Sequence, residues 1–352
     1  MQPRLEFRSD NAAGVAPEIL AAVIEANTGS ALAYGADEWT AALQRRVAEV
    51  FEFPDVAVFP VVSGTAANAL GLSALCPPWG AVLCHESSHI ICSEGGATSL
   101  LGGGAVMVGL PGEGSLLQPE TVAATLAATN WGDPHQSQPA VLSLTEPSDR
   151  GALYRPAQIA ALAAAAAEHG LKVHLDGARL ANAIAGLGCS PSELTWRAGV
   201  DMITLGATKN GALSTDAIVS FDPAASEQLH YRTKRAGHVA SKMRFQSVQL
   251  DAYLTEGLWL RLAAAANAAM AALAEGLARL RFAFVVQPAV NMVFVRVSDE
   301  VADTVQAGGL DCYRMGPGVL RLVTSFQTSH GDVAGALELF AAAATAAAGG
   351  KA

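Results

Sequence analysis

The chain has 352 residues, of which 51% are hydrophobic and 15% are charged, and this composition excludes a disordered protein. Its formal net charge of −10 disfavours nucleic acid as a partner, because binding to a phosphate backbone needs a cationic surface. Residues 1–10 are mixed and charged rather than apolar, and the apolar stretches are interrupted before membrane length or are Ala-rich and amphipathic. We therefore expect a cytoplasmic globular protein of enzyme size.

The cysteines and neighbouring histidines predict neither a disulfide framework nor a metal site. The five cysteines are odd in number and include no Cys-x-x-Cys pair. Cys84, His85, His89 and Cys92 lie close together in the sequence. Structural zinc sites, however, usually space their ligands in tighter, repeated pairs.

Strands alternate with helices along most of the chain. We predict strands at residues 56–62, 81–84, 105–110, 140–144, 171–175, 202–205 and 217–221. The plainest helix covers residues 156–169, because Pro156 suits a first helical turn and Gly170 suits the end. This alternation is typical of an α/β protein whose mostly parallel sheet is covered by helices on both faces.

The alternation of strands and helices stops beyond residue 241. One long helical segment, rich in Ala and Leu, is expected over residues 246–280 and leads into a second domain. There we predict strands near residues 282–286, 292–297 and 319–323, and a closing helix over residues 332–348. The domains are thus a large one at residues 1–250 and a smaller C-terminal α/β domain at residues 251–352.

Ser63-Gly64-Thr65 directly follows the first strand and opens an apolar helix. The free N–H groups of such a helix start, with hydroxyls beside them, form a phosphate cradle. The same residues would serve equally well as a plain helix cap.

Two further stretches follow later strands. Asp176 ends the strand at 171–175 and is followed by Gly177 and Arg179, at the edge of the sheet where α/β proteins bind ligands. An Asp-Gly pair is also an ordinary turn. Lys209 lies between small residues at 206–211, which leave space for a ligand against the backbone, although a solvated surface lysine is the alternative.

One cofactor, pyridoxal phosphate, explains the order of these features. Its phosphate needs the cradle, and its pyridine nitrogen needs a carboxylate such as Asp176 to stay protonated. Lys209 would hold its aldehyde as a Schiff base, and His89 would stack on its ring. His89 precedes two isoleucines, so a core histidine is a competing interpretation.

The chain resembles the L-threonine aldolases, of the low-specificity or phenylserine aldolase type, within the aminotransferase-like fold type I of pyridoxal phosphate enzymes. The similarity covers nearly the whole chain and is carried by residues 9–11, 34–37, 63–68, 88–89, 94–96, 174–179, Lys209 and 321–324. It implies a large domain with a mostly parallel seven-stranded sheet and a smaller C-terminal domain. It also implies a homodimer or homotetramer with shared active sites.

The resemblance assigns roles to individual residues. The catalytic residues would be Lys209, His89 and Asp176, and the cofactor would also contact Ser63, Gly64, Thr65, Arg179, Tyr34 and Arg235. Tyr34 and the Lys234-Arg235 segment would come from the neighbouring subunit. The substrate carboxylate would be bound by Ser9, Arg179 and Arg321 through charge-assisted bonds.

Several of these residues have other interpretations. Arg321 interrupts an apolar strand, and a buried arginine is costly without an anion, so a carboxylate-binding role is favoured. Arg179 could merely begin a helix, Glu94 could orient water or cap, and His85 and His174 are interpreted as structural. Many members of the family carry a histidine that contacts the substrate hydroxyl where this chain has residues 147–150, and Asp149 aligns with it only loosely.

We therefore expect a retro-aldol lyase that cleaves L-β-hydroxy-α-amino acids, such as threonine, allo-threonine and phenylserine, to glycine and an aldehyde. Residues 206–213 resemble the branch that accepts aromatic substrates. A water held near His89 and Glu94 would act as the base. The alternatives are another reaction of the same cofactor, namely β-elimination, racemisation or transamination, and a catalytically silent binding protein. A nicotinamide dehydrogenase is disfavoured, because no Gly-x-Gly-x-x-Gly opens a helix after the early strands.

Overall fold

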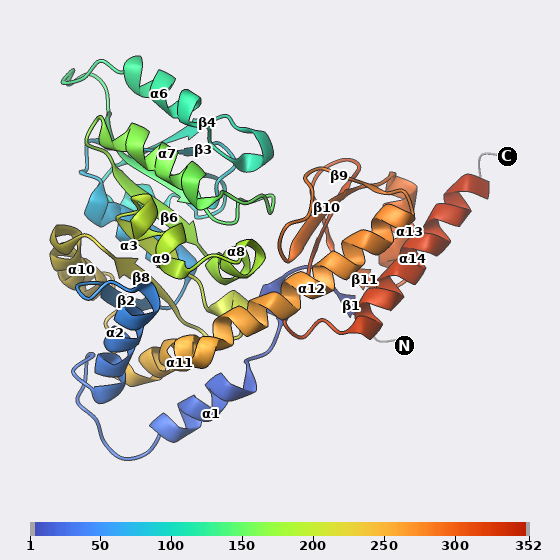
Figure 1. Ribbon diagram of the computed structural model, residues 1–352, viewed down its shortest axis with the longest axis horizontal. Coiled ribbons are helices and arrows are strands. Elements are labelled where there is room, and N and C mark those ends of the chain that lie inside the picture. The colour runs from blue at the N-terminus through green and yellow to red at the C-terminus, as the bar shows by residue number, and fades with distance from the viewer. Residues whose placement is uncertain (1–3, 350–352) are drawn as a thin grey trace.

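The larger part of the molecule is built on one sheet, seen in the computed structural model, which describes residues 4–349 (Figure 1). Its strands are β2 (Ala57–Val61), β3 (Gly80–His85), β4 (Val106–Leu110), β5 (Gln138–Thr145), β6 (Lys172–Gly177), β7 (Met202–Leu205) and β8 (Asp216–Ser220). They lie in the order β2-β8-β7-β6-β5-β3-β4. Only β8 pairs antiparallel, with both of its neighbours. All seven predicted strands and the mostly parallel sheet are thus confirmed.

Helices cover both faces of this sheet. The longer ones are α1 (Pro17–Ala26), α2 (Glu38–Phe51), α3 (Gly64–Leu75), α6 (Pro119–Ala127), α7 (Pro156–Ala167), α8 (Leu180–Leu187) and α10 (Pro223–Arg235). Shorter turns are η1 (Asp10–Ala12), α4 (His89–Cys92), α5 (Ala97–Leu101), η2 (Glu113–Ser115), α9 (Pro191–Leu194), η3 (Trp196–Ala198) and η4 (Thr208–Asn210). Side chains alternate along β3, since Val82 packs with Leu72 of α3 and Leu83 packs into the core that contains Ile159 of α7.

A second, smaller sheet lies at the other end of the molecule (Figure 1). It contains β9 (Ala283–Phe284), β10 (Met292–Arg296), β12 (Tyr313–Arg314) and β13 (Val319–Val323), flanked by α13 (Asp299–Ala307) and α14 (His330–Gly349). The three predicted strands and the closing helix are present. The N-terminal strand β1 (Leu5–Glu6) pairs with β11 (Leu310–Asp311), and Phe7 belongs to the core of this smaller part. The N-terminal segment therefore packs with the C-terminal residues.

The predicted helix over residues 246–280 is wrong in one respect, because it is broken. It forms α11 (Arg244–Leu254) and α12 (Leu258–Arg279), joined by η5 (Thr255–Gly257). Glu256 and Gly257 adopt left-handed conformations with φ of 50° and 67°, which end the first helix.

The helix α12 connects the two hydrophobic cores. Trp259 packs in the core of the large sheet and Met270 in the core of the small one. By length and composition alone, the stretch Arg244–Arg279 could cross a membrane. Its larger apolar side chains, such as Leu258, Trp259, Met270 and Leu273, instead pack in these two cores. A domain division at residue 250 stays a prediction.

Two glycines bring the ends of β6 and β7 together. A Cβ on Gly206 would overlap the carbonyl of Ala178, and a Cβ on Gly177 would lie 2.6 Å from the carbonyl oxygen of Thr204. Only glycine permits this approach of the two backbones. As a result, the end of β6 that carries Asp176 and the loop that carries Lys209 lie side by side at one edge of the sheet.

Candidate active site

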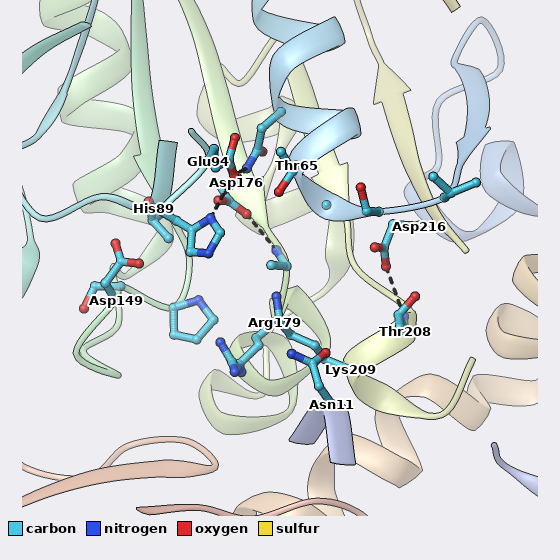
Figure 2. Close-up of a pocket in the computed structure, with 18 residues that line it drawn as sticks. Asn11, Thr65, His89, Glu94, Asp149, Asp176, Arg179, Thr208, Lys209 and Asp216 are labelled. Carbon is cyan, nitrogen blue, oxygen red and sulfur yellow. Dashed lines mark hydrogen bonds and ion pairs between the residues drawn. The ribbon is translucent and has the colours of Figure 1, made fainter. Parts of the chain in front are cut away.

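A cavity of about 310 Å³ lies at the carboxyl ends of the parallel strands (Figure 2). Nine residues singled out from the sequence line it: Ser63, Gly64, Thr65, His89, Glu94, Asp149, Asp176, Arg179 and Lys209. They come from separate segments that follow or end five different strands. The fold thus brings together residues up to 146 positions apart, counted from Ser63 to Lys209.

The N-terminus of α3 forms one wall of the cavity. Ser63 has an extended backbone, and its Oγ accepts a hydrogen bond of 3.3 Å from the N–H of Ala66. The first N–H groups of a helix, here those of Gly64 and Thr65, have no intrahelical partner. Both predicted roles are therefore compatible with the structure. Ser63 caps the helix, and the start of the helix faces a cavity that can take an anion.

A buried hydrogen-bond network joins Asp176 to His89. The amide nitrogen of Asn68 donates to Asp176 Oδ2 at 2.9 Å and to Glu94 Oε1 at 2.8 Å. His89 Nδ1 donates to the same Glu94 oxygen at 2.9 Å, and this bond raises the pKa of His89. The His89 side chain is 44% exposed, so it is not a core histidine. Asn68 was given no role from the sequence, although it lies within the 63–68 motif.

The network continues beneath the cavity. Thr204 Oγ1 donates to Asn68 Oδ1 at 2.7 Å and lies 3.4 Å from His174 Nε2. Ser143 Oγ lies 2.9 Å from the other ring nitrogen of His174. Complete burial lowers the pKa of His174 to about 4, which keeps the ring neutral. His174 thus supports the floor of the site and does not line it.

The loop that carries Lys209 is held by Asp216. The backbone N–H groups of Ala207 and Thr208 donate to Asp216 Oδ1 at 2.8 and 3.0 Å. Next along the chain, Asn210 Nδ2 donates to the hydroxyl of Tyr253 at 2.9 Å. Lys209 itself is half-buried and forms no ion pair with any residue between 4 and 349. Its amine is therefore available to a ligand.

Arg179 forms a bidentate ion pair with Asp10, at 2.6 and 2.8 Å. Burial alone would raise the pKa of Asp10, but Arg179 and Asn291, whose amide donates at 3.0 Å, hold that pKa below its ordinary value. Asp10 was also missed from the sequence, although it lies within the 9–11 motif. One edge of the Arg179 guanidinium is thus fixed by the protein.

Arg321 lies near Arg179 but does not line the main cavity. Its Nη2 donates to the carbonyl of Arg8 at 3.1 Å, and the guanidinium lies 5.1 Å from the ring centre of Tyr313. Its Nε is buried and has no partner in the described part of the chain. Burial and the charge of Arg179 lower the pKa of Arg321. A half-buried guanidinium whose Nε lacks a partner fits an anionic group.

Three predicted residues lie elsewhere. Ser9 caps η1 by accepting from the N–H of Asn11 at 3.2 Å and lines a separate cavity of about 170 Å³, whereas Asn11 lines the main one. Tyr34 is 57% exposed, with Lys234 Nζ 4.3 Å from its ring centre, and Arg235 is exposed on α10. Their contribution to a partner's site stays a prediction.

The comparisons with known proteins agree with this geometry. A family model described as beta-eliminating lyase matches residues 6–300. A low specificity L-threonine aldolase from Pseudomonas sp. is 38% identical over 332 residues, which cover 93% of this chain and 94% of the relative. The threonine aldolase structure from Leishmania major has a TM-score of 0.90 at 25% identity, over 96% of this chain and 99% of the other.

A more distant structure shares the fold alone. The aspartate aminotransferase of Thermus thermophilus has a TM-score of 0.69 at 20% identity, over 97% of this chain and 92% of the other. The aminotransferase-like fold is thereby confirmed.

The cavity fits the pyridoxal phosphate that this fold family implies. The start of α3 offers free N–H groups for a phosphate, and Lys209 offers an amine without an ion-pair partner in the described residues. Asp176 is 3% exposed and keeps its carboxylate at the cavity wall through bonds from Asn68 and from the N–H of Ala178, at 2.9 and 3.0 Å. These are the donor, amine and carboxylate that the cofactor needs.

Proposed function

The chain belongs to the beta-eliminating lyase family, as a relative of the low specificity L-threonine aldolases, and from this membership we propose that it cleaves L-β-hydroxy-α-amino acids. The products are glycine and an aldehyde, the cofactor is pyridoxal phosphate, and the substrates are threonine, allo-threonine and phenylserine. The observation that carries this proposal is the convergence of Lys209, Asp176 and the start of α3 on one cavity.

The residues of the cavity divide the work of a retro-aldol cleavage. When bound, pyridoxal phosphate would supply an electron sink for the electron pair that remains on the α-carbon after the Cα–Cβ bond breaks. Asp176 would hold a proton on the pyridine nitrogen, Lys209 would hold the cofactor aldehyde, and His89 would stack on the ring. The substrate carboxylate would bind to Arg179 and Arg321, which would orient the Cα–Cβ bond for cleavage.

A panel of substrates tests this function. The purified, cofactor-loaded protein is expected to form glycine and the matching aldehyde from threonine, allo-threonine and phenylserine, measured by amino-acid analysis and aldehyde reduction. Pyruvate or a keto acid as the main product would show elimination or transamination instead, and the D-isomer would show racemisation. A protein that binds no cofactor at all would be a silent member of the fold.

We also propose that the active enzyme is a homodimer or homotetramer in which Tyr34 and Arg235 reach the partner's cavity. Tyr34 and Tyr231 are 57% and 71% exposed, so both side chains are accessible to a partner. Co-expression of Lys209→Ala and Tyr34→Ala chains is expected to restore part of the activity, because a mixed dimer would contain one intact site. A monomer in sedimentation velocity, or no restoration, would contradict this arrangement. A cytoplasmic location stays a prediction from the sequence.

A further inference from the structure

The cavity is lined by four carboxylates, and they are not equivalent. Glu94, Asp176 and Asp216 each accept at least two hydrogen bonds from other residues. Asp149 accepts none from any other residue in the described part of the chain and forms no ion pair there. Asp149 is half-buried at the cavity wall, so its carboxylate oxygens are open to a ligand group that carries a proton.

The loop that carries Asp149 is rigid. Ser148 Oγ donates to the carbonyl of Gly114 at 2.8 Å and accepts from the N–H of Ala152 at 3.1 Å. The backbone adds a bond of 2.8 Å from the N–H of Gly151 to the Ser148 carbonyl. Figure 2 shows Asp149 beside His89, on the side of the cavity away from Lys209. The Asp149 carboxylate is therefore held in place across the cavity from the Lys209 amine.

This position suits the β-hydroxyl of the substrate, the group that neither Lys209 nor the arginines would bind. Pro147 and Asp149 line the wall across the cavity from Lys209. A substrate with its amine at Lys209 and its carboxylate at the arginines would direct the substituent on its α-carbon toward this wall. We propose that Asp149 is the catalytic base that removes the proton from the substrate's β-hydroxyl, a role that rests on the proposed function. The O–H bond breaks as the proton moves to Asp149, the C=O bond of the aldehyde forms, and the Cα–Cβ electron pair stays on Cα. The α-carbon then takes up a proton and becomes that of glycine.

The other groups at this wall are less suited to the task. The Glu94 side chain is 0% exposed, and its Oε2 is buried without a hydrogen-bond partner in the described residues. Its Oε1 already accepts from Asn68 and His89, and the bond to His89 raises the pKa of that ring and so favours its protonated form. Burial, with the charge of Asp176 added, raises the pKa of Asp149 to about 7. A base is most effective when its pKa lies near the working pH. The expected base, a water near His89 and Glu94, is therefore replaced by Asp149 in this proposal.

The variant Asp149→Asn keeps the size of the side chain and removes the base. We expect kcat for phenylserine and threonine cleavage to fall by about 100-fold or more, the usual contribution of a general base. Glycine has no β-hydroxyl, so exchange of its α-proton with D₂O, followed by NMR, should stay within about two-fold of the parent rate. The dissociation constant of glycine and the cofactor absorbance spectrum should also be unchanged.

The dependence on pH gives a second readout. His89, Asp176 and Arg179 are the charged groups that face Asp149 from the neighbouring elements. The base must be ionised, so kcat/KM of the parent enzyme should rise with pH through about 7, and Asp149→Asn should lose this rise. Arg150→Gln, an exposed neighbour in the same loop, should retain both the rate and the pH profile.

The possible outcomes separate the proposals. Unchanged cleavage in Asp149→Asn would overturn the role of Asp149 while leaving the lyase function intact. Parallel loss of cleavage and glycine exchange would overturn it as well, because Asp149 would then support the whole site. A parent protein that exchanges glycine but cleaves no β-hydroxy amino acid would instead end the proposed function, and the role of Asp149 with it.

Discussion

Replacing Lys209 with alanine is expected to reduce turnover by about 1,000-fold or more, the scale on which loss of a covalent catalytic group acts. The Lys209 side chain lines the cavity, is half-buried, and has no ion-pair partner in the described residues. Its loop is fixed by Asp216, so the change removes the amine without removing what holds the backbone. Cofactor should still bind through the start of α3, but with lower affinity.

Chemical trapping of the cofactor on its lysine tests the role of Lys209. Borohydride reduction of the parent protein should fix the cofactor to the peptide that contains Lys209, as seen by mass spectrometry, and Lys209→Ala should carry no fixed cofactor. Lys172→Met is a matched control. Lys172 lies at the start of β6, whose other end carries Asp176, and it pairs with Asp201 and Asp222. It should keep the reduced adduct and the activity. A reduced adduct at another lysine in Lys209→Ala would contradict the assignment.

The sequence was sufficient for those parts of the fold and site that depend on local pattern. The seven strands and the helix start at Ser63 follow from apolar runs and turn residues, and Lys209 and Asp176 were found because each follows a strand. The break at Glu256 was not predictable, because nothing there but one glycine interrupts the helical composition.

Pairings between distant residues could not be predicted from one sequence. Asn68 meets Asp176 across 108 positions, and Arg179 meets Asp10 across 169. Such contacts depend on the order of strands in the sheet, which the local pattern does not give. The role of Asp149 likewise depends on which carboxylates of the cavity already have partners.

Asp176→Ala should lower turnover by about 100- to 1,000-fold even where the cofactor still binds, because no group would then keep the pyridine nitrogen protonated. The same change leaves the buried Asn68 amide and the Ala178 N–H without one acceptor each. An unsatisfied buried donor costs about 1–3 kcal/mol, so the free energy of unfolding should fall too. The alanine variant alone therefore mixes a chemical effect with a structural one.

Asp176→Asn separates the two effects. An asparagine keeps one acceptor oxygen, so only one of the two donors, Asn68 or the Ala178 N–H, loses its acceptor, and the free energy of unfolding should fall less than in Asp176→Ala. The lost negative charge should remove most of the activity. Asp176→Glu keeps the charge and should recover part of the rate. The measurements are kcat for phenylserine, the melting temperature and the pH at which the spectrum of the bound cofactor changes. If Asp176→Asn retained near-parent turnover and an unshifted spectrum, the carboxylate would serve only as an acceptor for Asn68, and the ring nitrogen would have to be protonated by another group.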